Sequence, residues 1–127
     1  MRLIIGVLIV LHGLVHLLYF GQSARYFELQ PGMLWPDGSW VFSKLLGDEQ
    51  TRRAAAMLLV VVAIGFVVGG IAIILGQVWG RRLNMALSIF SSLIFLLFWD
   101  GAWQQLDNKG AIGLLINAAI VIVSLIV

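Results

Sequence analysis

Long apolar stretches dominate the chain, and shorter segments between them carry nearly all of its charges. A helix needs about 20 apolar residues to cross the hydrocarbon of a bilayer, with a range of about 17–25. The alternation of apolar and polar positions expected for a membrane β-barrel is absent. The pattern therefore predicts membrane-spanning helices over residues 3–20, 54–78, 83–99 and 111–127.

The one long connection, residues 21–53, has the features of an ordered loop. It contains both prolines, Pro31 and Pro36, and the turn sequence WPDGSW. Its tryptophans suit the headgroup region of a membrane. We therefore predict an all-α integral membrane four-helix bundle, a single domain over residues 1–127, with a structured first extramembrane loop that caps it.

Composition supports a membrane protein and excludes several kinds of site. The chain is 61% hydrophobic and 11% charged, whereas soluble domains are about 45–50% apolar and about 25% charged. Cysteine is absent, which excludes disulfides, thiolate metal sites and cysteine nucleophiles. Because no basic run is long enough to bind nucleic acid, the net charge of +2 is interpreted as a topology signal.

The basic residues also predict an orientation. Four passes would place both termini on one side with Arg2, Arg81 and Arg82, and the other five basic residues and all six acidic residues on the opposite side. The short loop that holds Arg81 and Arg82 favours a cytoplasmic location for that side. We expect a multi-pass protein of the cell membrane with its N-terminus in the cytoplasm.

The two histidines of the chain, His12 and His16, lie four residues apart on one face of the first predicted helix, with Tyr19 beside them. Two later helices carry polar stripes, which should face one another inside a bundle because lipid leaves polar groups unpaired. The stripes consist of Asn84, Ser88, Ser91 and Ser92 in the third helix, and Asn117 and Ser124 in the fourth. In the simplest interpretation, the histidines hydrogen-bond to these serines and asparagines.

Two cofactor interpretations of the histidine pair are less favoured. A b-type haem takes axial ligands from opposite sides, whereas both imidazoles lie on one face of one helix. Their spacing fits two zinc ligands, but a third ligand would have to come from Glu28, Asp100 or Asp107. We assign no metal ligands, and a quinone or lipid remains the favoured cofactor class.

A third interpretation is a ligand or proton site near the membrane interface. His16 lies about one turn from the end of the first helix, and Asp100 follows the third helix at the same membrane face. The two could form an imidazole–carboxylate pair, and ionisable groups at membrane depth are commonly functional. The candidate ligand-binding residues are His12, His16, Tyr19, Trp99, Asp100 and Trp103, of which His16 and Asp100 are also the candidate catalytic pair.

The stretch IIGVLIVLHGLVHLL after Arg2, the four short apolar segments and the polar segment after the third resemble the DoxX/DoxD-like small membrane proteins. The resemblance implies a four-helix membrane fold and a link to quinone-dependent oxidation or membrane redox complexes. It identifies no catalytic residue.

Three functions remain open from the sequence. The leading one is an accessory membrane subunit that binds a lipid or quinone. The second is a small enzyme acting on a lipid or isoprenoid, in which His16 is the acid–base group. The third is an oligomeric channel or transporter. The expected partners are the bilayer, subunits of a membrane complex or further copies of the chain, and no nucleic acid.

Overall fold

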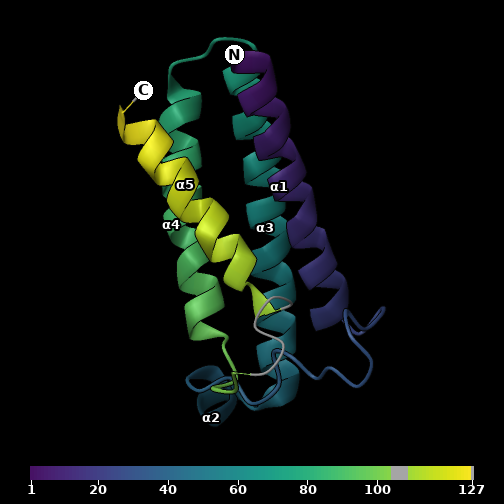
Figure 1. Cartoon of the computed structure of the whole chain (residues 1–127). Helices are drawn as coiled ribbons and strands as arrows, with labels where there is room; N and C mark the ends of the chain where they lie inside the picture. The colour runs from purple at the N-terminus through teal and green to yellow at the C-terminus, as the bar shows by residue number, and fades with distance from the viewer. Residues whose placement is uncertain (104–108, 127) are drawn as a thin grey trace.

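The computed structural model describes residues 1–103 and 109–126, and within them every regular element is a helix. The helices are α1 (Arg2–Ser23), α2 (Phe42–Leu46), α3 (Asp48–Ile74), α4 (Trp79–Leu97) and α5 (Ala111–Ile126). α1 packs along α3, α3 along α4, and α4 along α5 (Figure 1). The all-α prediction is confirmed.

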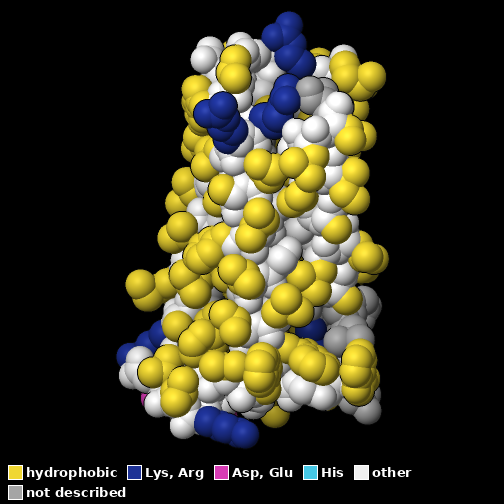
Figure 2. Space-filling model, turned by 90° about the vertical axis from the view of Figure 1, so that its left-hand side faces the viewer, with side chains coloured by type: hydrophobic (Ala, Val, Ile, Leu, Met, Phe, Trp, Pro, Cys, Tyr) yellow, Lys and Arg dark blue, Asp and Glu magenta, His cyan; other side chains and the backbone are white. Residues whose placement is uncertain are grey.

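Three of these helices, α1, α3 and α4, are long and apolar enough to cross a membrane. α5 is apolar but has only 16 residues. Hydrophobic side chains cover the long face of the molecule, and lysine and arginine side chains gather toward its two ends (Figure 2). This distribution is typical of a protein surrounded by lipid along its length.

The second long helix differs in its bounds from the predicted segment 54–78. It begins at Asp48, because the polar residues ahead of the apolar run already form its first turns. It ends at Ile74, where Gly76 adopts a positive φ of 75° and the amide of Gln77 donates to the carbonyl of Ala72. Glycine in this conformation is a common helix terminator. The next helix accordingly starts at Trp79, earlier than predicted, and ends at Leu97.

α1 lies close to α3 because glycines form the contact. A Cβ atom placed on Gly13 would lie 2.6 Å from Cβ of Phe66 and 3.1 Å from the carbonyl oxygen of Ala63. A Cβ on Gly70 would lie 2.7 Å from the carbonyl oxygen of Gly6. The two backbones therefore approach closely, as small residues allow in membrane helices.

α3 makes a second close contact, with α4, at Gly65 and Gly69. A Cβ on Gly65 would lie 2.7 Å from a methyl group of Leu87, and Gly69 lies directly against Asn84. In α3, Gly70 thus serves the contact with α1, and Gly65 and Gly69 serve the contact with α4.

The connection after α1 folds back onto the helices through a buried glutamine. Gln22 has no exposed surface, and its Nε2 donates to the carbonyls of Met33 and Trp35 at 3.0 and 3.1 Å. Its Oε1 accepts the amide of Leu29 at 2.8 Å. Trp35 is 1% exposed and packs against the rings of Tyr19 and Phe95.

One carboxylate of this connection, Asp37, pairs with an arginine of the connection and with an arginine of α3. Asp37 accepts from Arg25 at 2.8 Å and from Arg52 at 2.7 Å. The connection is therefore fixed by hydrogen bonds, by an ion pair within it and by one ion pair to the start of α3.

Gln22→Ala should release this connection. The change removes three hydrogen bonds and leaves the buried carbonyl of Met33 without a donor, which costs about 1–3 kcal/mol, whereas the carbonyl of Trp35 keeps its bond from Arg25. Because local cleavage follows the population of the open form, tryptic cleavage at Arg25 should become at least about tenfold faster. Gln77→Ala, at an exposed glutamine, is the control and should leave the cleavage rate unchanged. Equal rates in both variants would show that Gln22 does not hold the connection.

Candidate functional site

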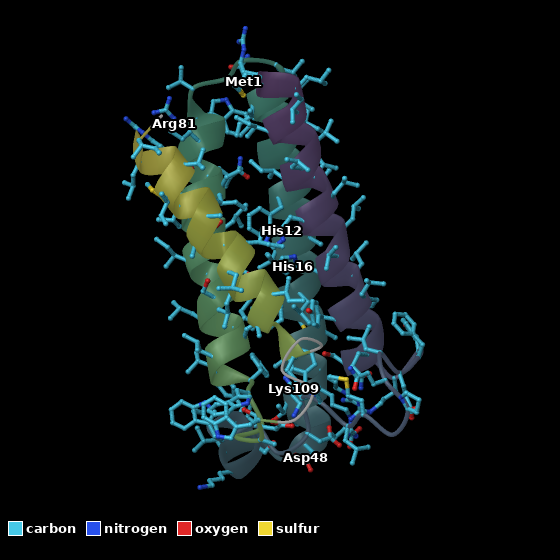
Figure 3. The ribbon with its side chains drawn as sticks, in the orientation of Figure 1. Met1, His12, His16, Asp48, Arg81 and Lys109 are labelled. Atoms are coloured by element: carbon cyan, nitrogen blue, oxygen red, sulfur yellow. The ribbon has the colours of Figure 1, made fainter. Side chains whose placement is uncertain are left out.

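A polar cluster joins three helices at mid-height. His12 and His16 extend from α1 into the interior (Figure 3). His12 Nε2 lies 2.7 Å from Asn117 Oδ1 of α5, and His16 Nε2 lies 2.8 Å from Ser91 Oγ of α4. Asn117 Nδ2 donates to Ser91 at 3.1 Å and to Ser92 at 3.2 Å. The predicted pairing of the histidines with the serine and asparagine stripes is confirmed.

The direction of each hydrogen bond in this cluster follows from the chemistry of the partners. His16 Nδ1 lies 2.9 Å from the backbone carbonyl of His12, which can only accept, so Nδ1 carries the proton and Nε2 accepts from Ser91. The side-chain oxygen of Asn117 also can only accept, so His12 Nε2 is the donor. The cluster is a closed ring of bonds with a single consistent direction.

One histidine nitrogen remains outside this ring. His12 Nδ1 is buried and has no hydrogen-bond partner among the described residues, and the whole residue is 5% exposed. Because Nε2 holds the proton of the neutral ring, Nδ1 presents a bare lone pair. A buried acceptor without a partner costs about 1–3 kcal/mol, and a hydrogen-bond donor from a ligand or a water would remove this cost.

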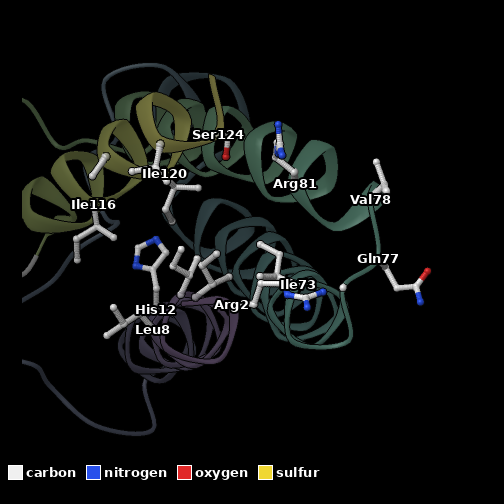
Figure 4. A pocket seen from close by; sticks show the side chains of 15 residues that line it. Arg2, Leu8, His12, Ile73, Gln77, Val78, Arg81, Ile116, Ile120 and Ser124 are labelled. Atoms are coloured by element: carbon white, nitrogen blue, oxygen red, sulfur yellow. The ribbon is translucent and has the colours of Figure 1, made fainter. Parts of the chain in front are cut away.

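A cleft of about 450 Å³ is lined in part by His12. Its walls are mostly aliphatic, and His12 is at one end of it, with the ring extending from α1 toward α5 (Figure 4). The polar and charged residues among its lining are Arg2, His12, Gln77, Arg81 and Ser124. The aliphatic walls include Ile5, Leu8, Ile9, Ile73, Ile116, Ile120 and Val123.

The cleft is bounded by α1 on one side and α5 on the other. These two helices do not pack along each other, and they diverge toward the end that holds the N-terminus (Figure 1). The bond between His12 and Asn117 links them at the narrow end. Arg2 and Arg81 line the cleft at the end where α1 and α5 lie farther apart, which we call its wide end (Figures 1 and 3).

The two arginines of the cleft have no carboxylate partner among the described residues. Neither Arg2 nor Arg81 forms an ion pair there, and the guanidinium of Arg2 lies against Gly76 in the α3–α4 turn. Arg81 lies at the same end of the molecule as Met1, and Asp48 lies at the opposite end (Figure 3). The wide end of the cleft is therefore a cationic rim above an apolar interior.

The predicted pair of His16 and Asp100 is not formed. Both ring nitrogens of His16 are engaged by His12 and Ser91. Asp100 instead accepts from the buried ammonium of Lys109 at 2.8 Å and from the amide of Ala102. The sequence placed Asp100 at the correct end of α4 but could not reveal that the next cation along the chain folds back onto it.

The aromatic residues predicted to line the site also lie elsewhere. Trp99 and Trp103 contact each other, with ring centroids 5.3 Å apart, and Trp103 is 75% exposed. Tyr19 packs edge-on against Trp35 and Phe95. Of the six predicted ligand residues, only His12 lines the cleft.

The part of the chain that the structure describes offers no set of ligands for the metal site that the histidine spacing suggested. Within the described residues, no group of three or more histidine and carboxylate side chains is placed to hold a metal ion. Asp107, one of the carboxylates considered for zinc, lies outside the described residues.

No protein-family description, curated protein or solved structure matches the chain. The resemblance to DoxX/DoxD-like proteins therefore stays a prediction. What the protein does must be inferred from the cleft and the polar cluster.

The cleft was missed from the sequence, although a signal for it exists. Arg2, Ile5, Ile9 and His12 are spaced three, four and three residues apart, which places them on one face of α1. This face of α1 is apolar between the charge of Arg2 at one end and the imidazole of His12 at the other, which is the pattern of one side of a ligand site. Only the divergence of α1 from α5 turns that wall into a cavity.

Proposed function

We propose that this protein is a multi-pass membrane protein of four helices that binds a lipid-like molecule in the cleft between α1 and α5. α5 spans about 24 Å at 1.5 Å per residue, short of a hydrocarbon core of about 30 Å, and a helix of this length is accommodated by local thinning. The rim with Arg2 and Arg81 lies at the cytoplasmic face.

The observation that carries this proposal is the cleft itself. Its volume falls within the range of about 300–1,000 Å³ for small-molecule sites, and such sites combine apolar walls with few polar groups. Free arginines at its wide end suit an acidic headgroup at the depth where lipid headgroups lie. Aliphatic side chains along the rest suit a hydrocarbon chain.

The open side of the cleft supports entry from the bilayer. A lipid can move sideways between α1 and α5 with its headgroup still at the interface, so no aqueous path is required. The hydrogen bond of His12 to Asn117 closes the inner end and keeps the two helices joined there.

Binding without catalysis is the form of this function that the geometry favours. General acid–base chemistry requires a group within hydrogen-bond reach of the reacting atom, oriented by a second group. His16 has no free nitrogen to supply, and Asp100 is bound to Lys109. An accessory subunit that carries a lipid, or a quinone in its place, therefore accounts for the site better than an enzyme built on His16 and Asp100.

Native mass spectrometry of the protein extracted gently from membranes tests this proposal. Ala119 lines the cleft, so Ala119→Trp should fill it and remove a bound molecule that the wild type retains. Ala86 is exposed on α4 outside the cleft, and Ala86→Trp should retain the molecule. If the released molecule is a quinone and not a lipid, the cleft is still the binding site but the ligand belongs to a different class. A wild type without any bound molecule, or equal retention in both variants, would contradict the proposal.

A further inference from the structure

We infer that the ligand of the cleft is an acidic amphiphile that carries a hydrogen-bond donor, such as a hydroxyl group, part-way along its chain, and that His12 binds this donor. The inference rests on the proposed function, and adds to it a second recognition point deep in the membrane. It is drawn from the directed hydrogen bonds of the polar cluster and from the position of His12 in the cleft.

The polar cluster determines what His12 can recognise. The side-chain oxygen of Asn117 accepts the hydrogen bond from His12 Nε2. The amide nitrogen of Asn117 donates to Ser91 and Ser92, and these two bonds hold the side chain in place. Rotating the amide of Asn117 would lose these bonds. Neutral His12 is therefore held with Nδ1 as an acceptor, which favours a donor from the ligand over a carbonyl or an ether oxygen.

The position of His12 determines where that donor lies in the ligand. Arg2 and His12 are ten residues apart on α1, which corresponds to about 15 Å along the helix axis. An extended hydrocarbon chain with bonds of about 1.52 Å and angles of about 111° covers this distance in roughly twelve carbons. With its acidic group at Arg2 and Arg81, a ligand would bring roughly its twelfth carbon next to His12.

A plain acyl chain leaves the lone pair of His12 without a partner. A hydroxyl group at the same depth supplies the missing bond, and a carbonyl at that depth places two acceptors against each other. The expected difference between a hydroxylated and a plain chain is about tenfold in affinity, since a hydrogen bond to a buried acceptor contributes about 1.4 kcal/mol.

Three fatty acids of equal length test this inference: stearate, stearate hydroxylated near the twelfth carbon, and its oxo counterpart. Each is titrated into delipidated wild-type protein, with affinity measured by native mass spectrometry. We expect the hydroxy acid to bind about tenfold more tightly than stearate, and the oxo acid no more tightly than stearate. Equal affinity of the hydroxy acid and stearate, or tighter binding of the oxo acid, would overturn the inference.

Two variants separate the deep contact from the rim. His12→Phe keeps a ring of similar shape and should abolish the preference for the hydroxy acid while stearate still binds. Arg81→Gln should weaken binding of all three acids and preserve their order. The order measured on the wild type decides the inference even if His12→Phe fails to fold. Failure of the wild type to bind any of the three would instead count against the proposed function.

Discussion

Gly13→Leu is expected to lower the thermal unfolding midpoint in detergent micelles by roughly 10 °C, equivalent to about 3 kcal/mol. Gly13 lies where α1 crosses α3, and even a Cβ would come within 2.6 Å of Phe66 Cβ and 3.1 Å of a backbone carbonyl oxygen. A backbone oxygen cannot rotate away as a side chain does, so a leucine forces the two helices apart. That movement also displaces His12, the preceding residue, from Asn117.

Ala86→Leu is the matched control for this change. It adds a leucine at an exposed position of α4, where nothing must move to accommodate it. We expect its unfolding midpoint to stay within roughly 2 °C of the wild type, as is usual for surface substitutions. Similar midpoints for Gly13→Leu and Ala86→Leu would refute the close α1–α3 contact.

Asn117→Ala is expected to cost about 3 kcal/mol of stability, nearly as much as the glycine change. It removes three interhelical hydrogen bonds, which average about 0.6 kcal/mol each in a membrane protein. It also leaves the protonated nitrogen of His12 buried without an acceptor, at a further cost of about 1–3 kcal/mol. The midpoint of thermal unfolding measures the sum.

A second buried asparagine provides the comparison. Asn84 has no exposed surface either, but neither polar atom of its amide has a hydrogen-bond partner among the described residues. Asn84→Ala creates the same change in volume without removing a hydrogen bond, so it should cost about 1 kcal/mol or less. If Asn84→Ala were as destabilising as Asn117→Ala, the loss would reflect side-chain volume, and the directed cluster would not be the source of stability.

The helices and the polar cluster could be predicted because their causes lie in local pattern. Two imidazoles four residues apart must share a face, and hydroxyl and amide groups at membrane depth must find one another. Hence His16 meets Ser91 and His12 meets Asn117, although these pairs are 75 and 105 residues apart in the chain.

The partners of Asp100 and the cleft could not be predicted because they depend on how the helices are arranged in space. Lys109 pairs with Asp100, which is nine residues before it in the chain, and no helical or strand periodicity links the two positions. The cleft exists because α5 tilts away from α1 toward Arg2 and Arg81, and no periodicity encodes a tilt. Sequence periodicity assigns the polar face of a helix, whereas a cavity requires the angle between two helices.

Site-specific photo-crosslinking in native membranes tests most directly whether the cleft holds a selected ligand. A photoreactive amino acid replaces Ile120, which lines the cleft, or Leu115, which is 72% exposed on the outer side of α5. After irradiation, mass spectrometry identifies the molecules attached at each position. We predict that adducts at Ile120 are enriched in one acidic, hydroxyl-bearing amphiphile, whereas adducts at Leu115 follow the composition of the bulk membrane. The same mixture of lipids at both positions would contradict a selective site between α1 and α5.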